Sequence, residues 1–188
     1  MLAVRRLRCG EGGRVTASLV EALHAWHDFY IVLATAAATL IGTMFVVVSI
    51  GIGFLTPERA REGGVFLTPT VVHLGVILAS TLVAIAPFPE DRILWLAYGA
   101  LALGGLAYAA FVGAHVSRRR LERGDRLWYG LAPIAGYLAL LAAALLAARG
   151  MASCLWLLAA ALAFLLLAAI RNAWDIVIFF VVQPRGPG

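Results

Sequence analysis

The chain has 188 residues, of which 63% are hydrophobic and only 13% are charged. Water-soluble domains contain about a quarter charged residues, so this composition excludes a soluble globular enzyme and indicates an integral membrane protein. The formal net charge is +5, and all 15 basic residues are arginines. Because these arginines fall between apolar runs, they indicate basic loops beside a lipid bilayer and no nucleic-acid partner.

The N-terminal region precedes the first apolar run. Residues 1–17 are rich in Gly and Arg, and we expect a flexible tail. Ser18 and Glu21 have capping-box spacing, which predicts a short helix that leads, straight or with a bend, into the first span. The uncharged run that follows, residues 29–57, is longer than the apolar region of a signal peptide, so we expect a retained helix.

Five uncharged runs follow one another along the chain, with lengths of 29, 27, 25, 22 and 21 residues. A helix needs about 20 residues to cross the hydrocarbon core, and the runs lack the alternation of a membrane barrel strand. The sequence therefore predicts an all-α fold, a five-transmembrane-helix bundle that forms a single domain over residues 18–183, with residues 184–188 as a C-terminal tail. The predicted spans are about 29–55, 69–87, 93–116, 128–148 and 152–172, the last with an extension to 182.

Prolines mark some of the expected helix ends. Thr68-Pro69 provides a hydroxyl cap and a proline, which predicts the start of the second helix there. Pro87 and Pro89 should end that helix. Pro133 lies near the start of the fourth helix, where a proline needs no functional explanation.

The arginines near the membrane ends predict the orientation. One side would carry nine of them, and the other three, or six when the N-terminal tail is included. Because the side richer in Arg faces the cytoplasm, we expect the N-terminus outside and the C-terminus inside. The nine are Arg59, Arg61, Arg118, Arg119, Arg120, Arg123, Arg126, Arg171 and Arg185.

Small residues repeat every fourth position in two helices, where they let helix backbones approach closely. We expect both rows to pack within the bundle. An alternative is that the adjoining threonines of the first helix line a polar path, although hydroxyls that bond their own preceding carbonyls argue against it. The two rows are Ala34, Ala38 and Gly42 in the first helix, and Gly105, Ala109 and Gly113 in the third.

Polar residues at the end of the fifth run admit two interpretations. A helix over residues 152–182 would be about 46 Å long against a core of about 30 Å, so it must tilt and protrude, or break. Arg171 and Asp175 are four apart and share a helical face. They could form an interfacial anchor together with Trp174, or a buried polar site with Asn172.

The topology predicts a polar layer in the cytoplasmic half of the bundle. The second helix enters, and the third and fifth helices end, on that side. The layer would contain His73, His115, Arg171, Asn172 and Asp175. By contrast, His24, His27 and Asp28 belong to the opposite surface, and there we expect a solvated helix face.

We expect no catalytic residue, no metal and no cofactor. His73 and His115 permit axial haem ligation, but two isolated histidines more often form local hydrogen bonds. Ser80 lies about 10 Å along the helix from His73, too far for direct activation. Cys9 and Cys154 support neither a disulfide framework nor a metal site.

Four segments together resemble a group of small, uncharacterised bacterial inner-membrane proteins, some labelled modulators of a membrane-anchored ATP-dependent protease. The resemblance covers most of residues 26–182 and implies a bacterial inner-membrane location and a regulatory partner. The better-known proteins of that name resemble seven-helix proteins, whereas five spans are expected here. The four segments are Trp26-His27-Asp28-Phe29-Tyr30, residues 35–49, Thr68-Pro69-Thr70-Val71-Val72-His73 and Arg171-Asn172-Ala173-Trp174-Asp175.

These observations predict a non-enzymatic scaffold, modulator or assembly partner. It would act through helix–helix contacts with another membrane protein or within a homo-oligomer, because small-residue helix faces drive association in lipid. The alternative is a small transporter or channel that uses the predicted polar layer.

Overall fold

The computed structural model describes residues 19–51, 57–88, 90–117 and 126–181, and this part of the chain is helical with short connections. The expected tails, residues 1–17 and 184–188, and the proposed cap Ser18 lie outside it. In chain order the helices are α1 (Leu19–His24), α2 (His27–Gly51), α3 (Pro57–Ile85), α4 (Asp91–Ser117), the π-helix η2 (Arg126–Leu131), α6 (Ala132–Ala148) and α7 (Ser153–Val181).

Five of these helices are long and apolar enough to cross a membrane. The predicted all-α, five-helix bundle is confirmed, and the protein is a multi-pass membrane protein. The predicted short helix before the first span is α1, which is separated from α2 by Ala25 and Trp26. The candidate spans are His27–Ile50, Leu67–Ile85, Asp91–Ala114, Leu127–Ala148 and Ser153–Ile178.

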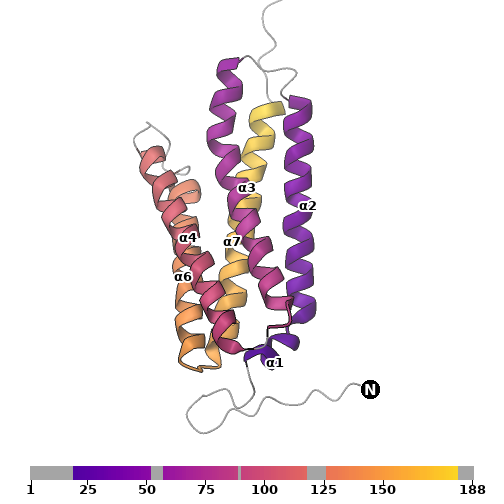
Figure 1. Ribbon diagram of the computed structural model, residues 1–188. Coiled ribbons are helices and arrows are strands. Elements are labelled where there is room, and N and C mark those ends of the chain that lie inside the picture. Colours follow the sequence, from indigo (N-terminus) through magenta and orange to yellow (C-terminus); the bar gives the residue numbers. More distant parts are fainter. Residues whose placement is uncertain (1–18, 52–56, 89, 118–125, 182–188) are drawn as a thin grey trace, which may run out of the picture.

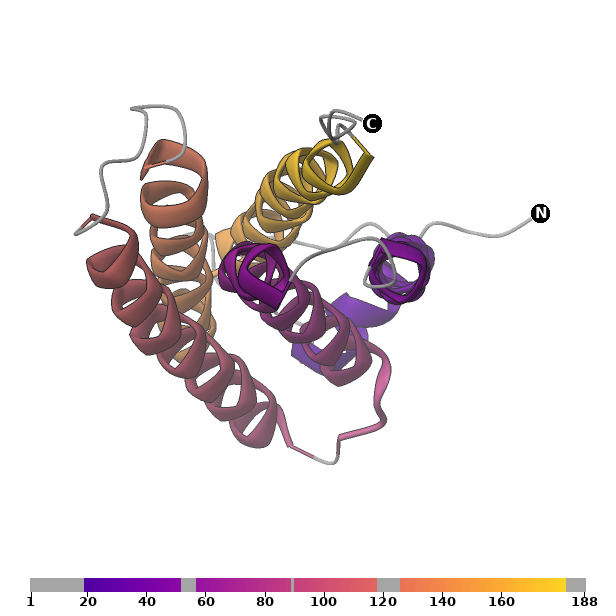
Figure 2. The ribbon, with the colours of Figure 1, turned by 90° about the horizontal axis from the view of Figure 1, so that it is seen from above.

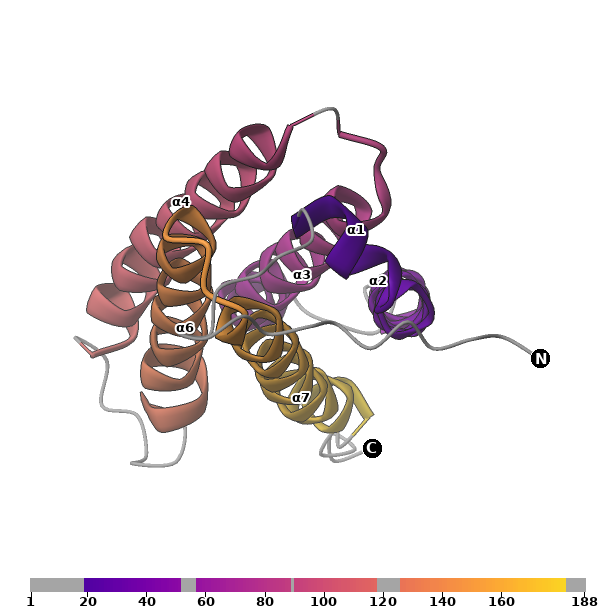
Figure 3. The same ribbon diagram turned by 90° about the horizontal axis from the view of Figure 1, so that it is seen from below.

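Successive spans run in opposite directions (Figure 1). Helix α7 packs against α6 on one side and against α2 and α3 on the other, and α4 packs against α6. Seen from above and from below, α2 and α4 lie at opposite edges of the bundle (Figures 2 and 3). Helix α1 and the C-terminus of α7 therefore lie at opposite ends, as an odd number of spans requires.

The tryptophans lie at two levels. Trp26 directly precedes α2, and Trp95 and Trp156 lie near the starts of α4 and α7; these three helix starts are low in Figure 1. Trp128 lies in η2 and Trp174 near the end of α7, and both of these segments are at the upper end. Trp156 and Trp174 are 71% and 63% exposed. They are 18 residues apart, which is five turns and about 27 Å, so they share one face of α7. This separation matches a hydrocarbon core of about 30 Å between two aromatic belts.

The start of α3 differs from the expected position, and the length of α7 decides between the two alternatives for the last helix. We expected the second helix to begin at Thr68–Pro69, but α3 begins at Pro57 and Pro69 lies inside it. Membrane helices tolerate an internal proline because neighbouring groups compensate for the missing N–H. Helix α7 continues unbroken to Val181, about 43 Å from its start, so the expected extension is present and the alternative of a break is wrong.

Close packing of α6 on α7 depends on a glycine. A Cβ atom at Gly136 would lie 2.6 Å from Cγ of Leu165, a side chain that is almost fully buried. The absence of a side chain at Gly136 therefore lets the two helices approach closely, the usual basis of helix association in lipid.

The two tryptophan levels can be tested with brominated phospholipids, which quench nearby tryptophan fluorescence. In proteins that retain only Trp156 or only Trp174, bromines near the headgroups should quench more strongly than bromines near the acyl-chain ends, because both residues lie in the belts. As a control, Phe164→Trp in a background without other tryptophans should show the reverse order, since it lies between the two levels on the same helix. Equal depth profiles at all three positions would contradict this membrane placement.

Candidate functional site

A histidine in the hydrocarbon region links two helices. His73 of α3 is 3% exposed, and its Nδ1 atom forms a 2.8 Å hydrogen bond with the hydroxyl of Tyr137 on α6. The ring of Tyr108, from α4, lies 6.0 Å from the His73 ring in an edge-on arrangement. Three helices therefore meet around one imidazole. The hydrocarbon core contains no water, so the imidazole of His73 and the hydroxyl of Tyr137 serve as hydrogen-bond partners for each other.

Gly105 on α4 makes room for Tyr137. A Cβ atom at Gly105 would lie 2.5 Å from Cζ of the Tyr137 ring, closer than two carbons can approach. Along the same row, Ala109 is fully buried, and a Cβ atom at Gly113 would lie 3.8 Å from the backbone of Gly130 in η2. The row Gly105, Ala109 and Gly113 thus lies on the face of α4 that packs against η2 and α6.

The other predicted row is oriented differently. On α2 the core face comprises Tyr30, Leu33, Ala37 and Met44, which are buried. Ala34 is only half-buried, and Ala38 and Gly42 are exposed. Among the described residues, nothing lies within 4 Å of a Cβ atom placed at Gly42. Contrary to expectation, Ala38 and Gly42 face away from the bundle, because helical periodicity identifies a shared face but not its neighbour.

The threonines beside this row bond within α2. The hydroxyls of Thr35, Thr39 and Thr43 donate to the carbonyls four residues earlier, at 2.8, 2.8 and 2.9 Å. All three residues are exposed on the outer side of the helix. Their hydroxyls therefore have partners without water, so the face can contact lipid or another helix without leaving a donor unsatisfied.

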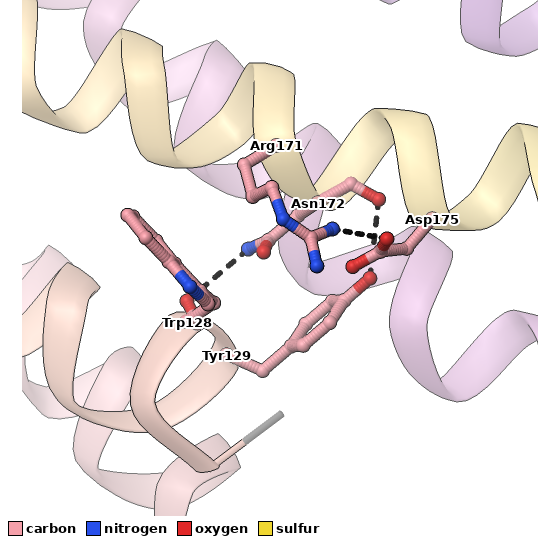
Figure 4. Close-up of polar contacts among 5 residues, drawn as sticks. All are labelled: Trp128, Tyr129, Arg171, Asn172 and Asp175. Carbon is pink, nitrogen blue, oxygen red and sulfur yellow. Dashed lines mark hydrogen bonds and ion pairs between the residues drawn. The ribbon is translucent and has the colours of Figure 1, made fainter. Parts of the chain in front are cut away.

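Two reciprocal hydrogen bonds hold α7 to η2 (Figure 4). Asn172 is 2% exposed, and its Nδ2 donates to the carbonyl of Trp128 at 3.3 Å. In return, the Tyr129 hydroxyl donates to the backbone carbonyl of Asn172 at 3.1 Å. Each helix thus supplies one side-chain donor and one backbone acceptor to the other.

Pro133 explains why the Trp128 carbonyl accepts an outside donor. In a π-helix each carbonyl bonds to the N–H five residues later, and for Trp128 that residue is Pro133, which has no N–H. The Asn172 amide supplies a donor to this carbonyl. The sequence contained this signal, because a proline inside an apolar run leaves an earlier carbonyl in need of a partner. Tyr129 and Tyr137 could have been found similarly, since a buried hydroxyl needs a partner.

Arg171 and Asp175 form the ion pair that their spacing predicts, and it lies on the outer surface of α7. Their side chains are 45% and 30% exposed, and the neighbouring Trp174 is 63% exposed. Of the polar side chains in this segment, that of Asn172 is buried and faces η2 (Figure 4). The exposed Arg171–Asp175 pair therefore fits the interpretation as an interfacial anchor. The buried Asn172 fits the interpretation as a buried polar contact.

The structure does not place the predicted polar residues in one layer of contacts. His73 reaches Tyr137, whereas Asn172 reaches Trp128 and Tyr129. These partners are eight or nine residues apart on η2 and α6, about 12 Å along the axis. The side chain of His115 lies outside the described residues.

Some buried polar atoms of the interior have no hydrogen-bond partner. They include Nε2 of His73, Oδ1 of Asn172, the Tyr30 hydroxyl and the Ser80 hydroxyl. Within the described ranges, no group of three His, Cys, Asp or Glu residues is arranged to hold a metal ion. The Tyr98 hydroxyl of α4 donates to the backbone carbonyl of Ser80 on α3 at 3.2 Å. Hydrogen bonds between helices in the described interior thus join α3 to α6, α4 to α3, and α7 to η2.

Comparison of the chain with models of protein families, with curated proteins and with solved structures found no match. Function must therefore be inferred from the geometry of the described residues. Two features of that geometry stand out, namely the hydrogen bonds between helices and the outward row of small residues on α2.

Two adjacent glycines test the His73–Tyr137 contact. Gly105→Ala should lower the free energy of unfolding by about 1–3 kcal/mol, because the added methyl group displaces a buried ring from its hydrogen bond. Gly104→Ala should leave it unchanged or slightly raised, since nothing lies within 4 Å of a Cβ atom at that position. Unfolding in detergent, followed by circular dichroism, measures both. Equal stability of the two variants would show that Tyr137 does not occupy the space beside Gly105.

Proposed function

We propose that this protein is a non-enzymatic assembly or modulator protein of the bacterial inner membrane. It binds another membrane protein, or a second copy of itself, through the α2 outer face, which comprises Thr35, Ala38, Thr39, Gly42 and Thr43. The observation that carries the proposal is the exposure of this small-residue row on the side of α2 away from its own bundle.

The α2 outer face has the properties that helix association in lipid requires. Lipid tails are as apolar as leucine, so burial of apolar surface provides little driving force, and close van der Waals packing provides most of it. Ala38 and Gly42 allow a second backbone to approach closely. The side chains of Thr39 and Thr43 are also small. Because their hydroxyls already donate to carbonyls of α2, a second helix can cover them without leaving a hydroxyl unbonded.

The outer face of α7 provides a contrast. Its exposed residues include Trp156, Leu167 and Trp174, which are 71%, 64% and 63% exposed. Bulky residues keep a second helix at a distance, and they pack well against mobile acyl chains. The outer surface of α2 also exposes bulky residues, among them Val32, Phe45 and Val46, but it has the row of small residues between them. That row is the part of α2 that suits another helix.

The family resemblance supports the same proposal. A label of protease modulator implies a partner protein and no activity of its own. The arginine count supports an orientation in which the end of the bundle that carries Arg171 faces the cytoplasm, with the N-terminus outside.

The alternative, a small transporter or channel, has less support. A polar route needs ionisable groups that face the interior or a water-filled cavity. The Arg171–Asp175 pair instead lies at the outer surface, and the contacts of His73 and Asn172 are about 12 Å apart.

Association can be tested with two glycine-to-isoleucine variants. When it is extracted from its native membranes in mild detergent, the wild-type protein should be recovered in a complex larger than the 20.0 kDa monomer, with a partner or with a second copy. Gly42→Ile should convert it to monomer, because the branched side chain prevents close approach of a second helix to α2. Gly104→Ile, the same change at an exposed glycine of α4, should preserve the complex. Light scattering gives the mass of the protein in each case.

Both variants should keep the wild-type unfolding midpoint, which shows that the bundle itself is intact. Recovery of wild-type protein only as monomer, or loss of the complex in the α4 variant alone, would contradict the proposal.

A further inference from the structure

The Arg171–Asp175 pair lies at the level of one membrane interface. Trp174 belongs to the upper tryptophan level and is exposed on the same helix. Arg171 is three residues closer to the hydrocarbon, about 4.5 Å, and Asp175 is one residue further from it. A long arginine side chain extends toward the headgroups from this depth. Both charges are therefore at the height of phospholipid headgroups.

The pair also has the capacity to bind a ligand. Neither side chain is buried, at 45% and 30% exposure, and the Arg171 guanidinium contacts the Asp175 carboxylate. A guanidinium group has five N–H donors and a carboxylate accepts through two oxygens, so each can serve more than one partner at once. The surface thus presents a positive and a negative group side by side.

We propose that this surface binds the headgroup of a zwitterionic phospholipid that has a primary ammonium group, of the phosphatidylethanolamine type. A phosphate oxygen accepts hydrogen bonds from Arg171, and the ammonium group donates to Asp175. Trp174 packs beside the glycerol region, as aromatic residues of the belt do.

Charge complementarity selects this headgroup over two others. A phosphate on Arg171 lies close to the Asp175 carboxylate, so an anionic headgroup without a cation meets repulsion there. A choline group carries the positive charge but has no N–H to donate. Only a primary ammonium both neutralises Asp175 and forms a charge-assisted hydrogen bond with it.

Native mass spectrometry of the detergent-solubilised protein can measure this selectivity. Phosphatidylethanolamine, phosphatidylcholine and phosphatidylglycerol with identical acyl chains are added at equal concentrations. Phosphatidylethanolamine adducts of the wild-type protein should be about three- to fivefold more abundant than either other adduct, as expected for one partly exposed charge contact.

Substitutions at the pair should change the preference in different directions. Asp175→Asn leaves the charge of Arg171 unbalanced, so the preference should shift to phosphatidylglycerol. Arg171→Gln should remove the preference for phosphatidylethanolamine. Arg149→Gln, at the exposed end of α6 on the opposite side of the membrane, should keep the wild-type preference. If Arg171→Gln does not fold, Arg171→Lys retains the charge and should retain the preference.

Equal abundance of the three adducts in the wild type, or a wild-type preference that Asp175→Asn leaves unchanged, would overturn the proposal. The site lies on α7 and not on the α2 outer face. Its test is therefore independent of whether the protein associates through α2.

Discussion

The hydrocarbon core of the bilayer offers no hydrogen-bond partners, and the structure depends on this constraint. A polar group within the spans is costly unless it has a partner in the protein, and lipid provides little driving force for burial of apolar surface. The hydrogen bond of His73 with Tyr137 meets this requirement between α3 and α6, and Asn172 meets it between α7 and η2. The few polar contacts of the interior therefore coincide with the places where helices are held together.

The same constraint gives small residues two roles in this chain. On α4, Gly105 leaves room for the ring of Tyr137, so that the Tyr137 hydroxyl reaches His73. On α2, Ala38 and Gly42 follow the same four-residue spacing, but they face outward. Small residues thus allow close helix packing inside the bundle on α4, and they leave the same kind of surface exposed to another helix on α2. One packing principle therefore underlies both the stability of the fold and its proposed function.

Charge spacing predicted much of the fold, and residue patterns could not predict the contacts between helices. Uncharged runs of 21 to 29 residues determine the number of spans, and spacing by four determines that Arg171 and Asp175 meet. Periodicity does not determine which neighbour a face meets, so the outward orientation of Gly42 was not foreseen. The partner of His73 is 64 residues away in the chain, and only the tertiary packing brings Tyr137 to it.

The proposed role of α2 can be tested most directly by photo-crosslinking in intact membranes. A small diazirine amino acid is placed at Ala38 or Gly42, and at Leu167 on the exposed face of α7 as the control. We expect covalent adducts with a protein, either a partner or a second copy, from positions 38 and 42, and adducts with lipid alone from position 167. Adducts with lipid alone from positions 38 and 42 would contradict it.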